Sequence, residues 1–120
     1  MKILIAEDEK MTLKMLSMKL QKDGYEVIQA EDGGVAMDYL EKNACPDLVI
    51  TDIMMPFYSG LEVVEKIRKD LKSKIPIIVL SAMGQEDSVE EAFKLGADDY
   101  ITKPFSPIEL SSRVKRLFNA

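Results

Sequence analysis

The sequence contains no histidine, and this absence excludes much of the usual chemistry of enzymes. Without an imidazole there is no Ser-His-Asp or Cys-His nucleophile, no histidine-ligated zinc and no imidazole general base. Any reaction at this protein must therefore use carboxylates, hydroxyls, lysine and an oxygen-loving metal.

The chain is also poor in cysteine, in long apolar runs and in blocks of positive charge. The single cysteine, Cys45, excludes an internal disulfide and favours a reducing, cytoplasmic setting, and we expect it to pack rather than to react. No apolar run approaches the ~20 residues of a membrane span, and the start MKILIAEDE is not that of a signal peptide. A net charge of -5 without a basic block argues against direct nucleic-acid binding.

What the sequence does contain is the pattern of an α/β protein. The 120 residues suit one domain over 1–120, without a linker, a repeat or a low-complexity segment. Short apolar runs alternate with helical segments, which predicts a doubly wound, five-stranded parallel sheet in the order 2-1-3-4-5 with five helices. Because these runs are mostly β-branched and continuous, we expect strands that are buried on both faces. The predicted strands are 2–6, 25–30, 47–51, 76–81 and 99–102.

The helical segments carry apolar stripes and start signals. Ser106, with Pro107 and Glu109 behind it, predicts a capping box at the start of the last helix. Asp32 is expected to open the helix after the second strand. Three stripes at helical spacing predict faces that pack in the core. They are Leu61, Val64, Ile67 and Leu71; then Leu110, Val114, Leu117 and Phe118; and finally Met11, Met15 and Met18.

Polar residues gather where the predicted strands end. Glu7 and Asp8 follow the first strand, and Asp52 follows the third. Ser81 ends the fourth strand, and Lys103 follows the fifth. In a doubly wound sheet, ligands bind beyond the carboxyl ends of the strands, where the strand order reverses. We therefore expect three acids, a hydroxyl and an ammonium to converge at one edge of the sheet.

Crowded carboxylates repel one another, and a divalent cation relieves this repulsion. Mg²⁺ prefers oxygen ligands and commonly takes one or two carboxylates with a phosphate oxygen, which makes Asp8 and Asp52 the natural direct ligands. An aspartate beside a metal and a lysine can act as a nucleophile toward phosphorus. Asp52 is therefore predicted to accept phosphate; a structural salt-bridge cluster is the alternative interpretation.

These residues resemble the receiver (CheY-like) domain of bacterial two-component response regulators, over essentially the whole chain. The resemblance rests on four stretches in order: AEDE with Asp8, DLVITDIMMP with Asp52, IIVLSA with Ser81, and GADDYITKPF with Lys103. Each stretch is weak alone, but the four together are specific. The strand order 2-1-3-4-5 is that of CheY itself, so the order and the family are not independent inferences.

The resemblance implies a function residue by residue. Asp52 would take a phosphoryl group from a phosphohistidine of a sensor histidine kinase or histidine phosphotransfer protein. Mg²⁺ or Mn²⁺ would be held by Asp8, Asp52 and the backbone carbonyl of Met54, with Glu7 in the outer shell. Glu7 replaces the first of two aspartates that the family often has. Lys103 would contact the phosphoryl group, and its bond to Pro104 is expected to be cis.

The resemblance also implies a switch and an output surface. Ser81 would shift toward the phosphate and Tyr100 would turn inward, changing the surface formed by the fourth helix, fifth strand and fifth helix, roughly 86–118. The chain would be a signalling domain rather than an enzyme, apart from self-catalysed phosphotransfer and slow autodephosphorylation. In receivers of winged-helix transcription factors, charged residues of this surface pair across a two-fold dimer. The alternative interpretation for this chain is a charged face that only contacts solvent. The candidates for such pairing are Lys94, Asp98, Asp99 and Arg113.

Three other functions are weighed against this one. A haloacid-dehalogenase-like phosphatase also uses aspartate, serine, lysine and Mg²⁺, but it carries an Asp-x-Asp motif after its first strand, where this chain has EDEK. A flavodoxin-like module for FMN needs a Gly/Ser/Thr loop at that place, and acids there repel phosphate. A receiver-like scaffold that no longer accepts phosphate stays open, as does the choice between a stand-alone receiver and one domain of a longer regulator.

Overall fold

The computed structural model describes residues 1–119, in which five strands alternate with helices as predicted. The strands are β1 (Lys2–Ala6), β2 (Glu26–Ala30), β3 (Leu48–Asp52), β4 (Ile77–Ser81) and β5 (Asp99–Thr102). The helices are α1 (Lys10–Lys22), α2 (Gly33–Lys42), α3 (Gly60–Glu65), α4 (Glu86–Leu95) and α5 (Pro107–Phe118), and a π-helical turn, η1 (Lys66–Asp70), continues α3. Each predicted strand differs from the observed one by at most one residue at an end.

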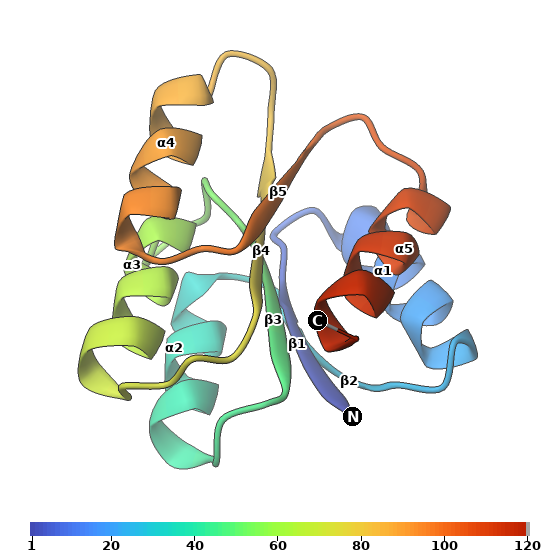
Figure 1. Cartoon of the computed structure of the whole chain (residues 1–120), viewed down its shortest axis with the longest axis horizontal. Coiled ribbons are helices and arrows are strands. Elements are labelled where there is room, and N and C mark those ends of the chain that lie inside the picture. The colour runs from blue at the N-terminus through green and yellow to red at the C-terminus, as the bar shows by residue number, and fades with distance from the viewer. Residues whose placement is uncertain (120) are drawn as a thin grey trace.

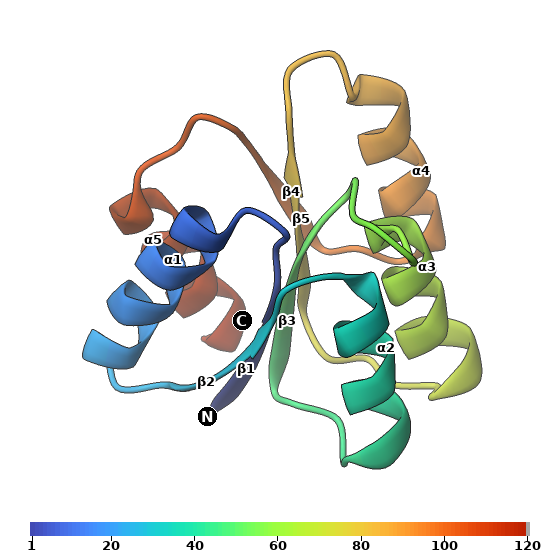
Figure 2. The same cartoon turned by 180° about the vertical axis from the view of Figure 1, so that it is seen from behind.

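The five strands form one parallel sheet in the order β2-β1-β3-β4-β5, which confirms the predicted order. Helices α1 and α5 cover one face, and α2, α3 and α4 cover the other (Figures 1 and 2). The register pairs Ala6 with Thr51 and Asp52 with Leu80. Because the strands are parallel, all their carboxyl ends lie at one edge, and the residues after β1 and β3 become neighbours.

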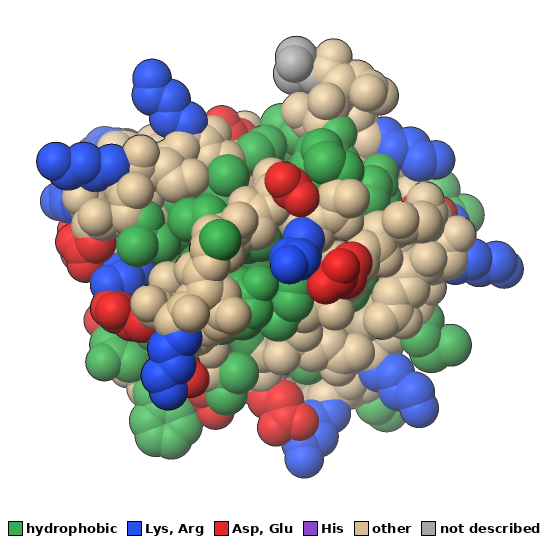
Figure 3. All heavy atoms as spheres, turned by 90° about the horizontal axis from the view of Figure 1, so that it is seen from below, with side chains coloured by type: hydrophobic (Ala, Val, Ile, Leu, Met, Phe, Trp, Pro, Cys, Tyr) green, Lys and Arg blue, Asp and Glu red, His purple; other side chains and the backbone are tan. Residues whose placement is uncertain are grey.

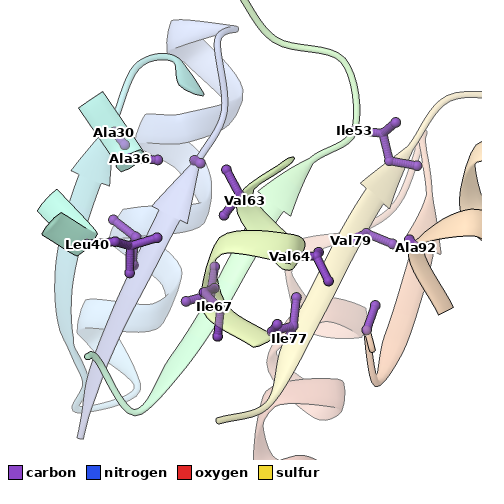
Figure 4. Packing of buried hydrophobic residues seen from close by; sticks show 14 residues of the cluster. Ala30, Ala36, Leu40, Ile53, Val63, Val64, Ile67, Ile77, Val79 and Ala92 are labelled. Atoms are coloured by element: carbon purple, nitrogen blue, oxygen red, sulfur yellow. The ribbon is translucent and has the colours of Figure 1, made fainter. Parts of the chain in front are cut away.

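Two apolar clusters sandwich the sheet. One lies between the sheet and helices α2, α3 and α4, and includes Val64 and Ile67 (Figure 4). The other lies under α1 and α5 and includes Leu110 and Val114. All residues of β3 and β4 are buried, since alternate side chains enter opposite clusters. This burial on both faces is why the two strands read as continuous apolar runs.

Side-chain caps fix the starts of three helices. The Asp32 carboxylate accepts from the backbone N–H of Val35 at 2.8 Å, which confirms its predicted place at the start of α2. Ser59 and Glu62 form a complete capping box at α3. At α5 only the Ser106 half of the predicted box forms. The Glu109 carboxylate instead lies 3.4 Å from the guanidinium of Arg113.

Two packing predictions are wrong. Met11, Met15 and Met18 are exposed by 83%, 45% and 59%, because α1 turns its other stripe, which includes Leu13 and Leu16, toward the sheet. Both stripes have helical spacing, so periodicity alone does not choose between them. Cys45 is exposed in the loop before β3 rather than packed.

The described residues include no helix that is both long and apolar enough to cross a membrane. Figure 3 views the edge of the sheet that holds the amino ends of the strands. Basic and acidic side chains are interspersed around this face, with an apolar area between them. The face therefore offers no block of positive charge for a polyanion.

Candidate functional site

Three carboxylates meet at the carboxyl ends of β1 and β3. Glu7, Asp8 and Asp52 each offer an oxygen, and these oxygens all lie within 4.8 Å of one another. Glu7 is completely buried, Asp52 is 7% exposed and Asp8 is open to solvent. The predicted convergence of the two strand ends is thus observed, with the deep part of the site closed and one side accessible.

Lys103 brings a positive charge into this cluster from the loop after β5. Its Nζ lies 2.7 Å from a Glu7 oxygen and 2.9 Å from an Asp52 oxygen. Its backbone N–H donates to the carbonyl of Ser81 at 2.7 Å, which ties the loop to the end of β4. The peptide bond between Lys103 and Pro104 is cis, as predicted.

Burial and charge shift the protonation of these groups. Burial raises the pKa of the Glu7 carboxyl, although its hydrogen bond from Lys103 opposes the change. Burial also raises the pKa of Asp8, and Glu7 beside it acts in the same direction. Burial alone would lower the pKa of the Lys103 ammonium, but its bonds to Glu7 and Asp52 outweigh that effect and raise it. Since one ammonium contacts two of the three carboxylates and no second basic group of the described chain is bound to them, negative charge is in excess among these four side chains.

The donor set fits a hard divalent cation such as Mg²⁺ or Mn²⁺. All three side chains offer carboxylate oxygens, and their excess negative charge is what such a cation neutralises. Among residues 1–119, no backbone amide donates to the carbonyl of Met54, whose side chain is 63% exposed. That carbonyl is therefore not committed to a backbone hydrogen bond. The residues present thus suit an oxygen-ligated metal next to Asp52.

The hydroxyl of Ser81 lies at the end of β4 and is 1% exposed. Its oxygen is 3.4 Å from the hydroxyl oxygen of Thr102 on the neighbouring strand β5. Thr102 is not among the site residues predicted from the sequence. The signal that identifies it is the strand register, because Ser81 pairs with Thr102.

Tyr100 lies in β5, two residues before Thr102. Its ring is 42% exposed and meets Phe93 of α4 edge to face, with 5.8 Å between the ring centroids. The ring thus lies on the outer side of β5, against α4, in this structure.

The four charged residues predicted for the output surface form ion pairs within the chain. Asp99 binds both Arg113 and Arg116, and Lys94 lies 3.6 Å from Glu90. Asp98 faces a different neighbour, Arg68, whose guanidinium lies 3.0 Å away. Its carboxylate also accepts from the backbone N–H of Ile77. These contacts give each charged group a partner without a second copy of the chain.

The response regulator receiver domain family matches residues 3–115. The chain belongs to this family. Receiver domains are the signalling domains of two-component systems, and members of the family generally bind Mg²⁺, in agreement with the acidic cluster.

Individual relatives agree with this assignment. The alkaline phosphatase synthesis transcriptional regulatory protein PhoP of Bacillus subtilis is 41% identical over 116 residues, which are 97% of this chain and 48% of PhoP. The receiver domain therefore spans about half the length of that relative. The structure of the Francisella response regulator 1452 receiver domain matches with a TM-score of 0.87 at 34% identity, covering 98% of this chain and 96% of that one. The chemotaxis response regulator CheY4 of Vibrio cholerae matches with a TM-score of 0.87 at 33% identity, covering 97% of each chain.

Proposed function

We propose that Asp52 of this receiver domain accepts a phosphoryl group from a phosphohistidine of a sensor histidine kinase or a histidine phosphotransfer protein. One observation carries the proposal. The carboxylate of Asp52 lies 2.9 Å from a lysine ammonium, and one of its oxygens is within 4.8 Å of oxygens of two further acidic side chains. This arrangement supplies a nucleophile, a fixed positive charge and a set of metal ligands at one point.

Mg²⁺ or Mn²⁺ would be held by Asp8, Asp52 and the backbone carbonyl of Met54, and Glu7 would act in the outer shell. When bound, such a cation supplies positive charge that favours phosphoryl transfer to a carboxylate. Lys103 holds one oxygen of Asp52 in place and supplies a second positive charge for the phosphoryl oxygens. The buried Glu7 carboxylate in turn fixes the ammonium of Lys103.

The transfer itself is a displacement at phosphorus. A carboxylate oxygen of Asp52 forms the new P–O bond as the P–N bond of the phosphohistidine breaks. The bonding electron pair stays on the imidazole nitrogen of the partner. A ring already protonated on its other nitrogen leaves as neutral imidazole, and an unprotonated ring becomes neutral by taking a proton from solvent. The product is an aspartyl phosphate beside Lys103 and Ser81, and its slow hydrolysis by water would return Asp52 to its carboxylate form.

The phosphorylated state would act through residues 86–118. We propose that Ser81 moves toward the phosphoryl group and that Tyr100 turns inward, which shifts the population between two packings of α4, β5 and α5. Lys94, Asp98, Asp99 and Arg113 are the proposed charged residues of this output surface, through which a homodimer would form. Because these groups are paired within the chain, dimer formation would require an exchange of ion pairs.

The proposal treats 1–120 as one receiver domain that acts in the cytoplasm as a phosphoacceptor, with no enzyme activity beyond its own phosphorylation and dephosphorylation. The test is incubation with acetyl phosphate and Mg²⁺, followed by intact-mass and peptide spectrometry. One phosphoryl group should be added, on the peptide that holds Asp52, and chelation of the metal should prevent it. No addition with the metal present would instead favour a receiver-like scaffold that does not take phosphate.

Replacing Lys103 by methionine should affect both chemistry and stability. The change removes a fixed charge from the proposed site and should slow labelling by acetyl phosphate roughly 100-fold. It also leaves the buried Glu7 carboxylate without its cation, which should lower the free energy of unfolding by about 2 kcal/mol. Labelling rates and urea unfolding measure the two effects. Lys94→Met, which removes an exposed lysine of α4, is the matched control, and equal behaviour of the two variants would refute the role of Lys103.

A further inference from the structure

The backbone N–H of Ala82 points toward the strand that carries Asp52. Strand β4 lies between β3 and β5, and the carbonyl of Ser81 accepts from the backbone N–H of Lys103, directly after β5, at 2.7 Å. In a trans peptide the C=O and the N–H point in opposite directions, so the N–H of Ala82 is turned to the β3 side. Strand β3 ends at Asp52, whose register partner Leu80 lies two residues before Ala82. The N–H of Ala82 is therefore directed to the side on which a phosphoryl group on Asp52 would stand.

That N–H already has an acceptor within the chain. The side-chain oxygen Oε1 of Gln85 accepts from the backbone N–H of Ala82, with 2.6 Å between the nitrogen and the oxygen. The backbone N–H of Gln85 returns a bond to the carbonyl of Ala82 at 3.3 Å. Gly84, at a φ of 89°, provides the left-handed residue of this tight loop. Because the N–H carries one hydrogen, a phosphoryl oxygen and the amide oxygen of Gln85 are alternative acceptors for it.

The bond to Gln85 is one that a phosphoryl group can replace. Ala82 is exposed and Gln85 is half-buried, so water reaches both ends of the bond. Hydrogen bonds to a charged acceptor are roughly twice as strong as those between neutral groups, which favours a phosphoryl oxygen over the amide oxygen. A groove of about 440 Å³ between α4 and β5, which Ser81, Ala82 and Gln85 line, leaves space for the displaced side chain. The exchange of acceptors therefore requires no rearrangement of the core.

Gln85 is also the residue at which helix α4 begins. It occupies the N-cap position, and its side chain makes no capping bond to the first turn of the helix. Its carbonyl accepts from the backbone N–H of Val89 at 3.0 Å. Gln85 thus holds the N–H of Ala82 through its side chain and the start of α4 through its backbone. Release of this side chain would connect a change at Asp52 with the start of α4.

We propose that Gln85 is a positioning residue that restrains phosphorylation of Asp52, because it holds the backbone N–H of Ala82 until a phosphoryl oxygen displaces it. The inference rests on the proposed function, since the competing acceptor is the phosphoryl group on Asp52. No covalent bond forms or breaks beyond the transfer already described, and one hydrogen-bond acceptor replaces another. If the contact only supported the loop, removal of the Gln85 amide would weaken binding of a phosphoryl group. Competition instead makes the same removal favourable, so the direction of the effect decides between the two roles.

The test uses beryllofluoride with Mg²⁺ as a non-covalent analogue of the phosphoryl group. Gln85→Met keeps the length of the side chain and removes its amide oxygen. This variant should bind beryllofluoride about fivefold more tightly than wild type, and acetyl phosphate should label it faster by a similar factor. The matched control is Gln21→Met, which makes the same change at an exposed position of α1 and should stay within about twofold of wild type. Unchanged or weaker binding by Gln85→Met would overturn the proposal.

The amide proton of Ala82 reports the contact directly. In the free protein its chemical shift should move upfield in Gln85→Met, and should stay near the wild-type value in Gln85→Glu, which keeps an acceptor oxygen. With beryllofluoride bound, wild type and Gln85→Met should show the same shift, because the probe is then the acceptor in both. An Ala82 shift that does not respond to the loss of the Gln85 amide would contradict the contact itself.

Labelling of Asp52 by acetyl phosphate on the same preparations separates this inference from the proposed function. Normal labelling with equal beryllofluoride affinity in wild type and Gln85→Met would overturn the competition alone. If neither wild type nor Gln85→Met is labelled or binds the probe, the proposed function is wrong and the competition falls with it. Labelling of Gln85→Met at a rate well above wild type would support both.

Discussion

Asp52→Asn should reduce labelling by acetyl phosphate and Mg²⁺ to background. The substitution replaces the nucleophilic carboxylate by an amide and removes one of the proposed metal ligands. The fold should survive the change, because the Asp52 charge repels Glu7, and Glu7 keeps its contact with Lys103. We expect the free energy of unfolding to stay within about 1 kcal/mol of wild type. Intact-mass spectrometry and urea unfolding measure the two quantities.

The matched control is Asp38→Asn. Asp38 is an exposed aspartate of α2 that pairs with Lys42 and lies outside the carboxylate cluster. This variant should accept one phosphoryl group at the wild-type rate. If Asp52→Asn is labelled as well as the control, the phosphate is carried elsewhere and the assignment of Asp52 is wrong.

Gly60→Ala should destabilise the protein by about 3 kcal/mol, through a clash that the fold cannot relieve cheaply. A Cβ at Gly60 would lie 2.1 Å from the backbone oxygen of Asp52. The backbone N–H of Gly60 also donates to the carbonyl of Ile53 at 2.8 Å, which holds the start of α3 against the end of β3. A side chain here must push α3 away from the loop that carries Asp52. Labelling should therefore slow together with the loss in stability.

Gly34→Ala is the control for this steric argument. A Cβ at Gly34 would have its nearest contact at 3.1 Å, with the side-chain oxygen of Asp32 rather than with backbone. That side chain can move, and alanine favours the helix by about 1 kcal/mol, so the variant should stay within about 1 kcal/mol of wild type. Urea midpoints give the comparison. Equal loss in both variants would mean that the close approach at Gly60 is not what limits substitution.

Much of the carboxylate site was predictable because the change from an apolar run to a polar residue marks where a buried strand ends. The run Leu48 to Ile50 marks a strand buried on both faces, and the polar residue that follows it must lie at the edge of the sheet. Together with Asp8 and Lys103, Asp52 was placed correctly by that reasoning, and the structure brings the three side chains together. The resemblance to the receiver domain agreed with this placement and added the cis bond before Pro104.

Other features were not predictable because they depend on which of two equivalent surfaces meets a neighbour. Helix α1 has a leucine stripe and a methionine stripe at similar spacing, and the methionine stripe was wrongly assigned to the core. Thr102 became part of the site through its register with Ser81, which is a relation between strands. The pairing of Asp98 with Arg68 joins residues 30 positions apart in the chain.

The sequence by itself determined the alternation of strands and helices, the edge of the sheet where the acids gather, and the absence of any catalytic histidine of the chain's own. These follow from local periodicity and composition, which act over a few residues. Only the tertiary structure decided the distances among Glu7, Asp52 and Lys103 and the groove between α4 and β5. The physical reason is that burial and charge pairing depend on the packing of distant segments, and one helix can satisfy its local preferences with either face turned to the sheet.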